Sequence, residues 1–240
     1  MAHSFSLRMT EPTQSQIIPR RPIRSYVLRS GRLTDSQKKA IAEHWQEFVI
    51  PTSDSLLDLQ DLFPQPGKLV VEIGFGMGDS LLENSLQEPS SNFIGIEVHQ
   101  PGIGKLLHGI AEQGSANLKI ICRDATEVLT RCIPLTTVDK VQIFFPDPWP
   151  KKKHQKRRIV QLDFMTVLRD RLKPGGKIHL ATDWQEYAEH MLVVMESVSG
   201  MHNQEGSGKF WEHPARPGTK FETRGKRLGH GVWDLMYVKE

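Results

Sequence analysis

A single segment joins an apolar run to a glycine-rich turn and then to the start of a helix. The run Leu69-Val70-Val71-Glu72-Ile73 is followed by Gly74, Gly76 and Gly78, and a helical apolar pattern begins at Leu81. A continuous apolar run is typical of a strand that is buried on both faces of a parallel sheet. Glycines after such a strand let the backbone come close to a ligand. The segment therefore predicts the opening unit of a doubly wound α/β sheet, with the three glycines at the ligand.

Acidic residues stand at the ends of the strands that this fold requires. Four further apolar runs are predicted to be strands, at residues 93–97, 118–122, 141–145 and 177–181. The acids at or just after the ends of these strands are Glu97, Asp124, Asp147 and Asp183, in addition to Glu72. The carboxyl ends of parallel strands meet at one edge of a sheet, so we expect these carboxylates to line one crevice.

The carboxylates restrict which ligand the crevice accepts. They would repel the pyrophosphate of a nicotinamide dinucleotide, and the Gly-x-Gly-x-Gly spacing departs from the Gly-x-Gly-x-x-Gly of that class. S-adenosylmethionine carries a sulfonium, an ammonium, a ribose diol and an adenine amino group, all of which suit carboxylates. Glu97 would accept from the ribose hydroxyls and Asp124 from the adenine amino group. We predict a methyltransferase, with a nicotinamide-dependent oxidoreductase as the alternative.

A stiff acidic turn and a basic run follow the predicted strand at 141–145. Prolines on both sides of Asp147 restrict the backbone of Pro146-Asp147-Pro148-Trp149. The cations that come soon after this turn are Lys151, Lys152, Lys153, Lys156, Arg157 and Arg158. A rigid acid beside an aromatic side chain and a row of cations indicates a catalytic edge that faces a polyanion. The alternative is a proline-rich turn before a solvated basic helix.

The composition fits one globular domain. The chain has 240 residues, of which 38% are hydrophobic and 25% charged, which is enough for one sizeable core. The formal net charge of +3 is weak evidence for a nucleic-acid partner, and the clustering of the cations is stronger evidence. Residues 1–32 are polar and basic, and we expect a flexible arm there, before a single domain at residues 33–240.

Apolar spacing predicts further elements around these strands. Helices are expected at residues 34–48, 159–172 and 184–197, and the second of them should stop at Pro174-Gly175-Gly176. Residues 199–208 are expected to form a polar loop, and residues 232–238 a last strand, antiparallel at the sheet's edge. Trp184 and Trp233 are expected in the core.

The two cysteines indicate the cellular compartment in which the protein resides. Cys122 and Cys132 lie in apolar settings, which argues against a disulfide scaffold, a zinc site and secretion, and favours the reducing cytoplasm. No apolar run is long enough to span a membrane, and the N-terminus lacks a signal-peptide core. Its Ser, Thr and Arg residues also fit a transit peptide, which is the alternative location. No metal site is predicted, because no histidine lies in a cluster with ligand spacing.

Six motifs occur in order along the chain. They are Glu72-Ile73-Gly74-Phe75-Gly76, Ile96-Glu97-Val98-His99, Pro146-Asp147-Pro148-Trp149, Lys156-Arg157-Arg158, Thr182-Asp183-Trp184 and Thr219-Lys220-Phe221-Glu222. Together they closely resemble the motifs of the bacterial tRNA (guanine-N7)-methyltransferase family, from about Arg21 to the C-terminus. The resemblance implies a class I, Rossmann-like methyltransferase fold, with a mostly parallel seven-stranded sheet and helices on both faces. It also implies methyl transfer from S-adenosylmethionine to N7 of a guanine in the variable loop of tRNA, at tRNA position 46.

The resemblance also implies roles for individual residues. It places Glu72, Glu97, Asp124 and Asp147 at the cofactor, in agreement with the strand-end prediction. The residues implied at the guanine nucleotide are Lys151, Asp183, Thr219, Lys220, Phe221 and Glu222. Those implied along the tRNA phosphates are Lys153, His154, Lys156, Arg157 and Arg158. Asp183 and Glu222 suit guanine, because its N1–H and its N2 amino group donate to carboxylates.

Asp147 is the predicted catalytic residue. N7 of guanine already holds an in-plane lone pair, so Asp147 is expected to act through alignment and negative potential rather than as a general base. Two other functions stay open: a non-catalytic RNA-binding scaffold, and a methyltransferase for small molecules or proteins. The expected partner is tRNA. The chain is compatible with a monomer or a homodimer, and no obligate protein partner is expected.

Overall fold

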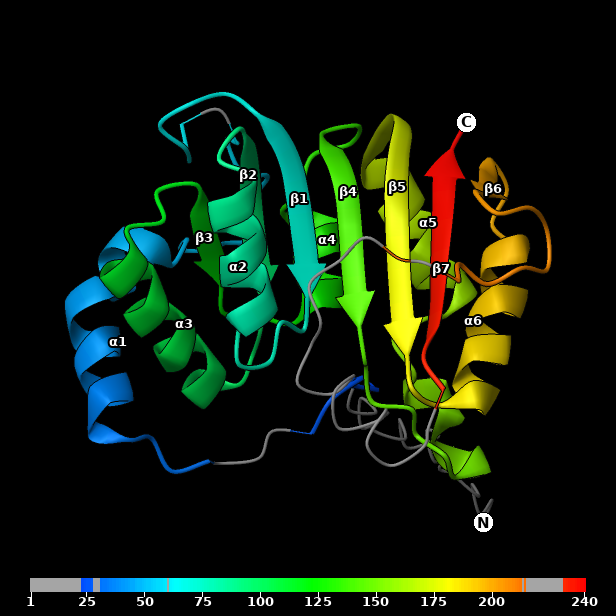
Figure 1. The fold of residues 1–240 in the computed structure, drawn as a ribbon, viewed down its shortest axis with the longest axis horizontal. Coiled ribbons are helices and arrows are strands. Elements are labelled where there is room, and N and C mark those ends of the chain that lie inside the picture. Colours follow the sequence, from blue (N-terminus) through cyan, green and yellow to red (C-terminus); the bar gives the residue numbers. More distant parts are fainter. Residues whose placement is uncertain (1–22, 28–30, 60, 213, 215–230) are drawn as a thin grey trace, which may run out of the picture.

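A computed structural model describes residues 23–27, 31–59, 61–212, 214 and 231–240. In this part of the chain seven strands form one sheet, in the order β3-β2-β1-β4-β5-β7-β6 (Figure 1). The strands are β1 Lys68–Ile73, β2 Ser91–Ile96, β3 Leu118–Ile121, β4 Val138–Phe144, β5 Leu172–Thr182, β6 Met201–Asn203 and β7 Trp233–Lys239. Neighbours from β3 to β5 are parallel, and β7 is antiparallel to both β5 and β6. The predicted mostly parallel α/β sheet is confirmed.

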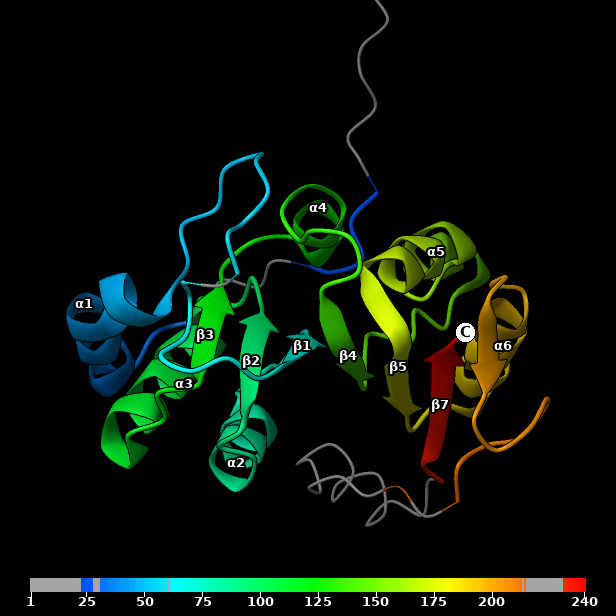
Figure 2. The ribbon, with the colours of Figure 1, turned by 90° about the horizontal axis from the view of Figure 1, so that it is seen from above.

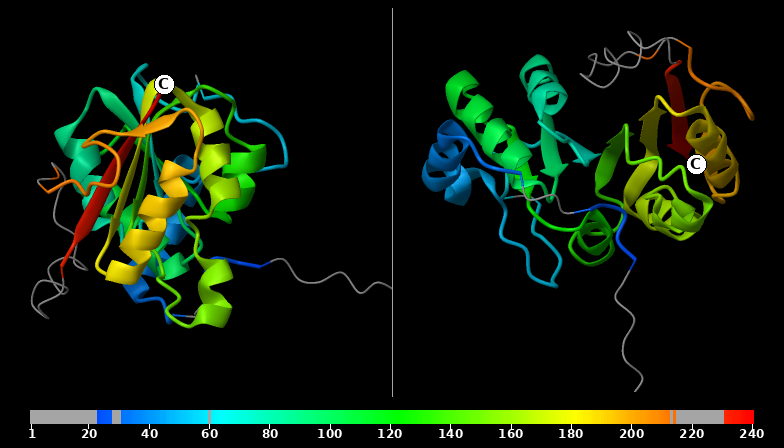
Figure 3. Two further views of the ribbon diagram at one scale, coloured as in Figure 1. Left: turned by 90° about the vertical axis from the view of Figure 1, so that its right-hand side faces the viewer. Right: turned by 90° about the horizontal axis from the view of Figure 1, so that it is seen from below.

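Helices cover both faces of the sheet, so the domain has three layers (Figures 2 and 3). The α-helices are α1 Asp35–Phe48, α2 Asp79–Gln87, α3 Gln100–Gln113, α4 Ala125–Arg131, α5 Leu162–Arg171 and α6 Gln185–Glu196. Helices α2 and α3 lie on one face, with α1 packed beside α3, and α4, α5 and α6 lie on the other. A short 3₁₀ helix, η1 Lys152–Arg157, follows β4.

The sheet separates two apolar cores, because successive residues of a strand point to opposite faces. On β1, Val71 packs in the core beneath α4, α5 and α6, whereas Val70 packs in the core beneath α1, α2 and α3. Both sides of the strand are therefore apolar, as the continuous run predicts. Glu72 shares the face of Val70 by alternation, so this strand carries a carboxylate into a buried position.

Two boundaries differ from the sequence predictions. The helix expected at residues 159–172 spans only Leu162–Arg171, and the following strand already begins at Leu172. Pro174-Gly175-Gly176 therefore lies inside β5, where the pairing with β4 skips these residues and Gly175 has a φ of 74°. The polar loop expected at residues 199–208 contains the short strand β6, which was missed because only three of its residues pair with β7.

The N-terminal residues 23–27 are attached to the domain. The Trp149 indole N–H donates to Ser25 O at 3.0 Å, and Arg157 donates to Arg24 O and Tyr26 O, each at 2.9 Å. This part of the expected flexible arm is thus held by hydrogen bonds from the segment after β4. The predicted boundary between arm and domain stays a prediction. None of the helices in the described ranges has the length and apolar character that crossing a membrane requires.

Candidate active site

A crevice of about 660 Å³ opens at the carboxyl ends of β1, β2 and β4, at the lower edge of the sheet in Figure 1. Its lining includes six of the seven residues predicted at the cofactor: Glu72, Gly74, Gly76, Gly78, Glu97 and the catalytic candidate Asp147. Parallel strands that end side by side bring these residues together from positions far apart in the sequence. Of the five strand-end acids expected to line one crevice, Glu72, Glu97 and Asp147 do so, whereas Asp124 is not among the lining residues and Asp183 lies in a separate hollow.

The glycine turn after β1 is tied to the end of β2. The Gly74 amide donates to Ile96 O at 2.8 Å, and the Gly76 amide donates to Glu97 Oε2 at 3.0 Å. The other oxygen of Glu97 accepts from the amides of Val98 and His99, at 2.6 and 3.0 Å. The backbone thereby fixes the direction of this carboxylate, and Oε2, which accepts only one of these amides, keeps a lone pair for a further donor.

Gly78 is required by the packing of this turn as well as by its backbone. Its φ is 78°, a value that side-chain-bearing residues rarely adopt, and a Cβ at this position would lie 2.9 Å from Leu106 Cβ of α3. At Gly74 and Gly76, which also have positive φ, a Cβ would lie within 4 Å of no atom of the described residues. These two glycines leave the wall of the crevice without side chains.

Glu72 is the most deeply buried acid of the site. Only 4% of it is exposed, and among the described residues its Oε2 has no hydrogen-bond partner. Burial raises the pKa of Glu72 to about 7, and the nearby Lys140 ammonium opposes this shift only in part. A buried acceptor without a partner at the wall of a crevice is a place for a cationic or hydrogen-bond-donating group.

Asp124, which is predicted at the adenine of the cofactor, has a structural role at the start of α4. Its Oδ1 accepts from the Thr126 amide at 2.8 Å and from the Thr126 hydroxyl, so it caps the start of α4. Tyr26 lies beside Asp124. Burial raises the pKa of the Tyr26 hydroxyl, and the negative charge of Asp124 raises it further. Tyr26 also lines the crevice and was missed by the sequence analysis, because nothing local distinguishes it within a polar arm.

Asp147 stands in a strained turn. Phe145 and Trp149, on either side of it, have φ values of 50° and 44°, which cost bulky residues of order 1–3 kcal/mol each. The Asp147 side chain itself is exposed at the mouth of the crevice. Such a turn persists only when its surroundings hold it, and the Phe145 amide donates to Ala181 O at 2.8 Å on one side.

The basic run divides into two groups. Lys151, Lys152, Lys153 and Lys156 are exposed, as expected of residues that face a polyanion. His154 is half-buried, with its ring edge against Trp149 at 5.8 Å between centroids. Arg157 and Arg158 depart from the expectation. The Arg157 guanidinium stacks on Trp149, at 4.0 Å from the ring centre, while binding residues 23–27, and Arg158 is buried.

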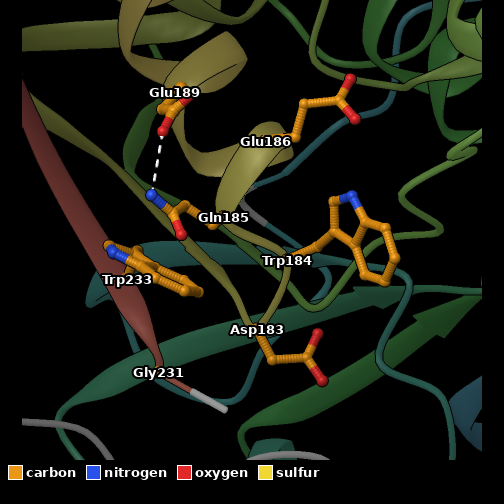
Figure 4. A pocket seen from close by; sticks show the side chains of 7 residues that line it. All are labelled: Asp183, Trp184, Gln185, Glu186, Glu189, Gly231 and Trp233. Atoms are coloured by element: carbon orange, nitrogen blue, oxygen red, sulfur yellow. Dashed lines mark hydrogen bonds between the residues drawn. The ribbon is translucent and has the colours of Figure 1, made fainter.

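Asp183 lies in a second, open hollow of about 580 Å³ at the start of α6 (Figure 4). Its other lining residues are Trp184, Gln185, Glu186, Glu189, Gly231 and Trp233. Trp184 is 37% exposed, so the expectation that it is a core residue is wrong. The hollow combines carboxylates with aromatic surface and holds no cation among these residues. Thr219, Lys220, Phe221 and Glu222 lie outside the described residues.

The described residues contain no cluster of three or more histidine, cysteine, aspartate or glutamate side chains that could hold a metal ion. Cys122 and Cys132 are both thiols. Burial raises the pKa of each, and the negative charge of Glu97 adds to the effect at Cys122.

Comparisons with known proteins identify the family. Residues 66–235 match a family described as "Putative methyltransferase". A tRNA (guanine-N(7)-)-methyltransferase of Pseudomonas putida is 48% identical over 222 residues, which cover 92% of each chain. The chain belongs to the tRNA (guanine-N(7)-)-methyltransferase family. A second member, from Pseudomonas entomophila, is 47% identical over 240 residues, which cover 100% of this chain and 99% of that one. The resemblance that rests on the six sequence motifs is thus confirmed.

Solved structures of more distant methyltransferases share the fold alone. The SAM-dependent methyltransferase from Aquifex aeolicus gives a TM-score of 0.50 at 14% identity, covering 73% of this chain and 84% of that one. The 16S rRNA methyltransferase KamB gives a TM-score of 0.50 at 16% identity, covering 73% of this chain and 89% of that one. These likenesses agree with the class I methyltransferase fold that the strand order displays.

Proposed function

We propose that this protein transfers a methyl group from S-adenosylmethionine to N7 of a guanine in tRNA, and that the guanine lies in the variable loop. The observation that carries the proposal is the crevice at the strand ends, in which Glu72 Oε2, buried and without a hydrogen-bond partner in the described part of the chain, lies near an exposed acid and a basic surface. Relatives that cover nearly the whole chain bear the name of this activity.

The crevice fits S-adenosylmethionine. Glu72 offers a carboxylate oxygen, Oε2, that lacks a hydrogen-bond partner within the described ranges, which suits a cationic group. Glu97 is held by three backbone amides, and its Oε2 has a lone pair left to accept from a hydroxyl of the ribose diol. Gly74 and Gly76 keep the wall clear of side chains, and the volume of about 660 Å³ lies in the usual range for cofactor sites. Pyrophosphate cofactors suit these acids poorly.

The chain's contribution to the reaction is alignment and electrostatics. S-adenosylmethionine supplies a methyl group bonded to a positively charged sulfur. Guanine N7 holds a lone pair in the plane of its ring, so no residue of the protein needs to remove a proton first. The positive charge moves onto the purine as the methyl group is transferred, and the Asp147 carboxylate at the crevice mouth would stabilise that charge. Its stiff turn would supply the alignment.

The two surfaces beside the crevice suit different parts of tRNA. The exposed lysines 151, 152, 153 and 156 provide positive charge for phosphates. The hollow around Asp183 is lined by acids, which repel phosphates but accept hydrogen bonds from the N1–H and N2 amino groups of guanine. Exposed Trp184 adds a surface on which a base would stack. A guanine that must leave its tertiary contacts would cost a few kcal/mol to extrude.

Two further expectations accompany this function. Both cysteines are thiols, which agrees with a cytoplasmic enzyme, where tRNA also resides. The chain is expected to act without an obligate protein partner, as a monomer or a homodimer, and sedimentation of the purified protein would decide between the two states.

Transfer of a labelled methyl group to tRNA transcripts tests the proposal. We expect incorporation into an unmodified transcript and none into a transcript made with 7-deazaguanosine, which has carbon in place of N7. Equal incorporation into both transcripts would exclude N7 as the acceptor. Binding of NADH without binding of S-adenosylmethionine would overturn the methyltransferase assignment and restore the oxidoreductase alternative.

A further inference from the structure

We propose that Arg158 is a positioning residue for methyl transfer, which fixes the turn that carries Asp147 against the start of α6, next to Asp183. The proposal rests on the proposed function. It assigns to Arg158 a role different from the phosphate contact that the sequence motif implies.

Arg158 bridges two segments with two different nitrogens. Its Nε donates to Pro148 O at 2.9 Å, and one terminal nitrogen donates to Glu186 Oε1 at 3.0 Å. The guanidinium also lies over the ring of Tyr187, at 4.9 Å from the ring centre. A planar fork of donors can satisfy both acceptors at once, which a lysine ammonium does less well.

The two ends of this bridge stand next to the two predicted reactive acids. Pro148 directly follows Asp147, and Glu186 lies in the first turn of α6, shortly after Asp183. Asp147 is exposed, so its own burial does not hold it in place. The strained backbone on either side of Asp147 requires support from outside the turn. The bridge through Arg158 is one such support. It also sets the distance between Asp147, predicted at the methyl group, and Asp183, predicted at the guanine.

The burial of Arg158 separates it from the neighbouring lysines. Only 3% of Arg158 is exposed, whereas Lys153 and Lys156 are exposed on η1. Glu186 also accepts from Gln155 Nε2 at 2.7 Å, so the acid end of the bridge is held by a second donor. A phosphate could reach the Arg158 guanidinium only by displacing these contacts. Arg158 therefore supports the site by holding other residues in place and does not contact a phosphate.

The test compares Arg158→Gln with Lys156→Gln, which removes an exposed cation two positions away. For Arg158→Gln we expect kcat to fall by about 30- to 100-fold, the effect of misplacing a catalytic group by about 1 Å. The dissociation constants for S-adenosylmethionine and tRNA, and the salt dependence of tRNA binding, should stay close to those of the wild type. Lys156→Gln, a substitution within the phosphate surface, should lower the log–log salt slope of tRNA binding by about 0.7–0.9, which Arg158→Gln should not do.

Glu186 variants carry the test if Arg158→Gln fails to fold, because Glu186 is half-exposed and its loss leaves no buried vacancy. Glu186→Ala should lower kcat about tenfold, since the bridge loses one end. Glu186→Gln, which keeps an acceptor oxygen, should restore most of the loss. In the double variant Arg158→Gln/Glu186→Ala the two losses should not multiply.

Wild-type kcat in Arg158→Gln or in Glu186→Ala would overturn the inference. So would an Arg158→Gln variant that lost tRNA affinity and about one salt-slope contact while keeping kcat, because that result identifies a phosphate contact. If the wild-type protein itself methylates no tRNA, the proposed function fails and this inference fails with it. If the wild type is active and the variants are unaffected, only the inference fails.

Discussion

Replacement of Glu72 by glutamine should change how the stability of the ligand-free protein depends on pH. The Glu72 carboxyl is 4% exposed, and burial raises its pKa from an ordinary 4.5 to about 7. Between these values the folded protein keeps the proton while the unfolded chain has lost it, so stability falls as the pH rises. The difference in pKa corresponds to about 3 kcal/mol, fully lost above pH 7.

Denaturant unfolding of the wild type and of Glu72→Gln, at intervals from pH 5 to pH 8, measures this effect. Groups other than Glu72 contribute alike to both proteins, so the difference between their unfolding free energies isolates Glu72. We expect the wild type to lose about 2–3 kcal/mol relative to the variant over this range, because a part of the full effect is already lost below pH 5. Parallel curves would refute the reasoning, because they would show that Glu72 ionises inside the protein at no cost.

The same carboxylate should make cofactor binding depend on pH in the opposite direction. A cationic ligand favours ionised Glu72, so below pH 7 binding releases a proton. As the pH rises toward the pKa of Glu72, the dissociation constant for S-adenosylmethionine should therefore fall by about tenfold per pH unit. Above that pKa it should level off. Titration calorimetry should find weaker binding without this trend in Glu72→Gln. The acid would thus destabilise the empty site and select its ligand.

Three other substitutions test separate parts of the site, and a fourth, Gly114→Ala, is a control outside it. Asp147→Ala should lower kcat at least 100-fold and leave the unfolding temperature unchanged, because the side chain is exposed, and methyl-transfer kinetics with thermal unfolding check this. Lys153→Gln should reduce the salt slope of tRNA binding by about 0.7–0.9 in filter-binding titrations. Gly78→Ala should destabilise the protein by about 2 kcal/mol or more in denaturant unfolding, whereas Gly114→Ala, with a similar φ of 71° but open space, should cost about 1 kcal/mol.

The parallel part of the sheet and the crevice were predictable because a continuous apolar run marks each of the strands β1 to β5. A carboxylate follows each run, and the topology of parallel strands brings Glu72, Glu97 and Asp147 to one edge without any knowledge of side-chain contacts. The family motifs predicted the methyl acceptor, guanine in tRNA, which neither the strand pattern nor the charge specifies. Apolar runs followed by an acid show where a strand ends and which carboxylate lies at that end.

The roles of Arg157 and Arg158 were not predictable from their place in a basic run. Arg157 and Arg158 are adjacent cations in the sequence. However, Arg157 contacts the N-terminal segment, while Arg158 points into the domain and binds Glu186. Only the tertiary placement of residues 23–27 and α6 decides this. The start of β5 before Pro174 was missed for a similar reason, because pairing with β4 resumes after the proline and glycines bulge out of the ladder.

The position of the new methyl group on tRNA decides whether the protein methylates N7 of a guanine in the variable loop. An unmodified tRNA transcript is incubated with the protein and S-adenosylmethionine, then treated with mild base and aniline, which cut the chain at N7-methylguanosine. The account predicts one new cleavage, in the variable loop, which disappears in Asp147→Ala. Two results would contradict the assignment as an N7 methyltransferase of tRNA. One is methyl incorporation without any cleavage, and the other is clear cofactor binding without any incorporation.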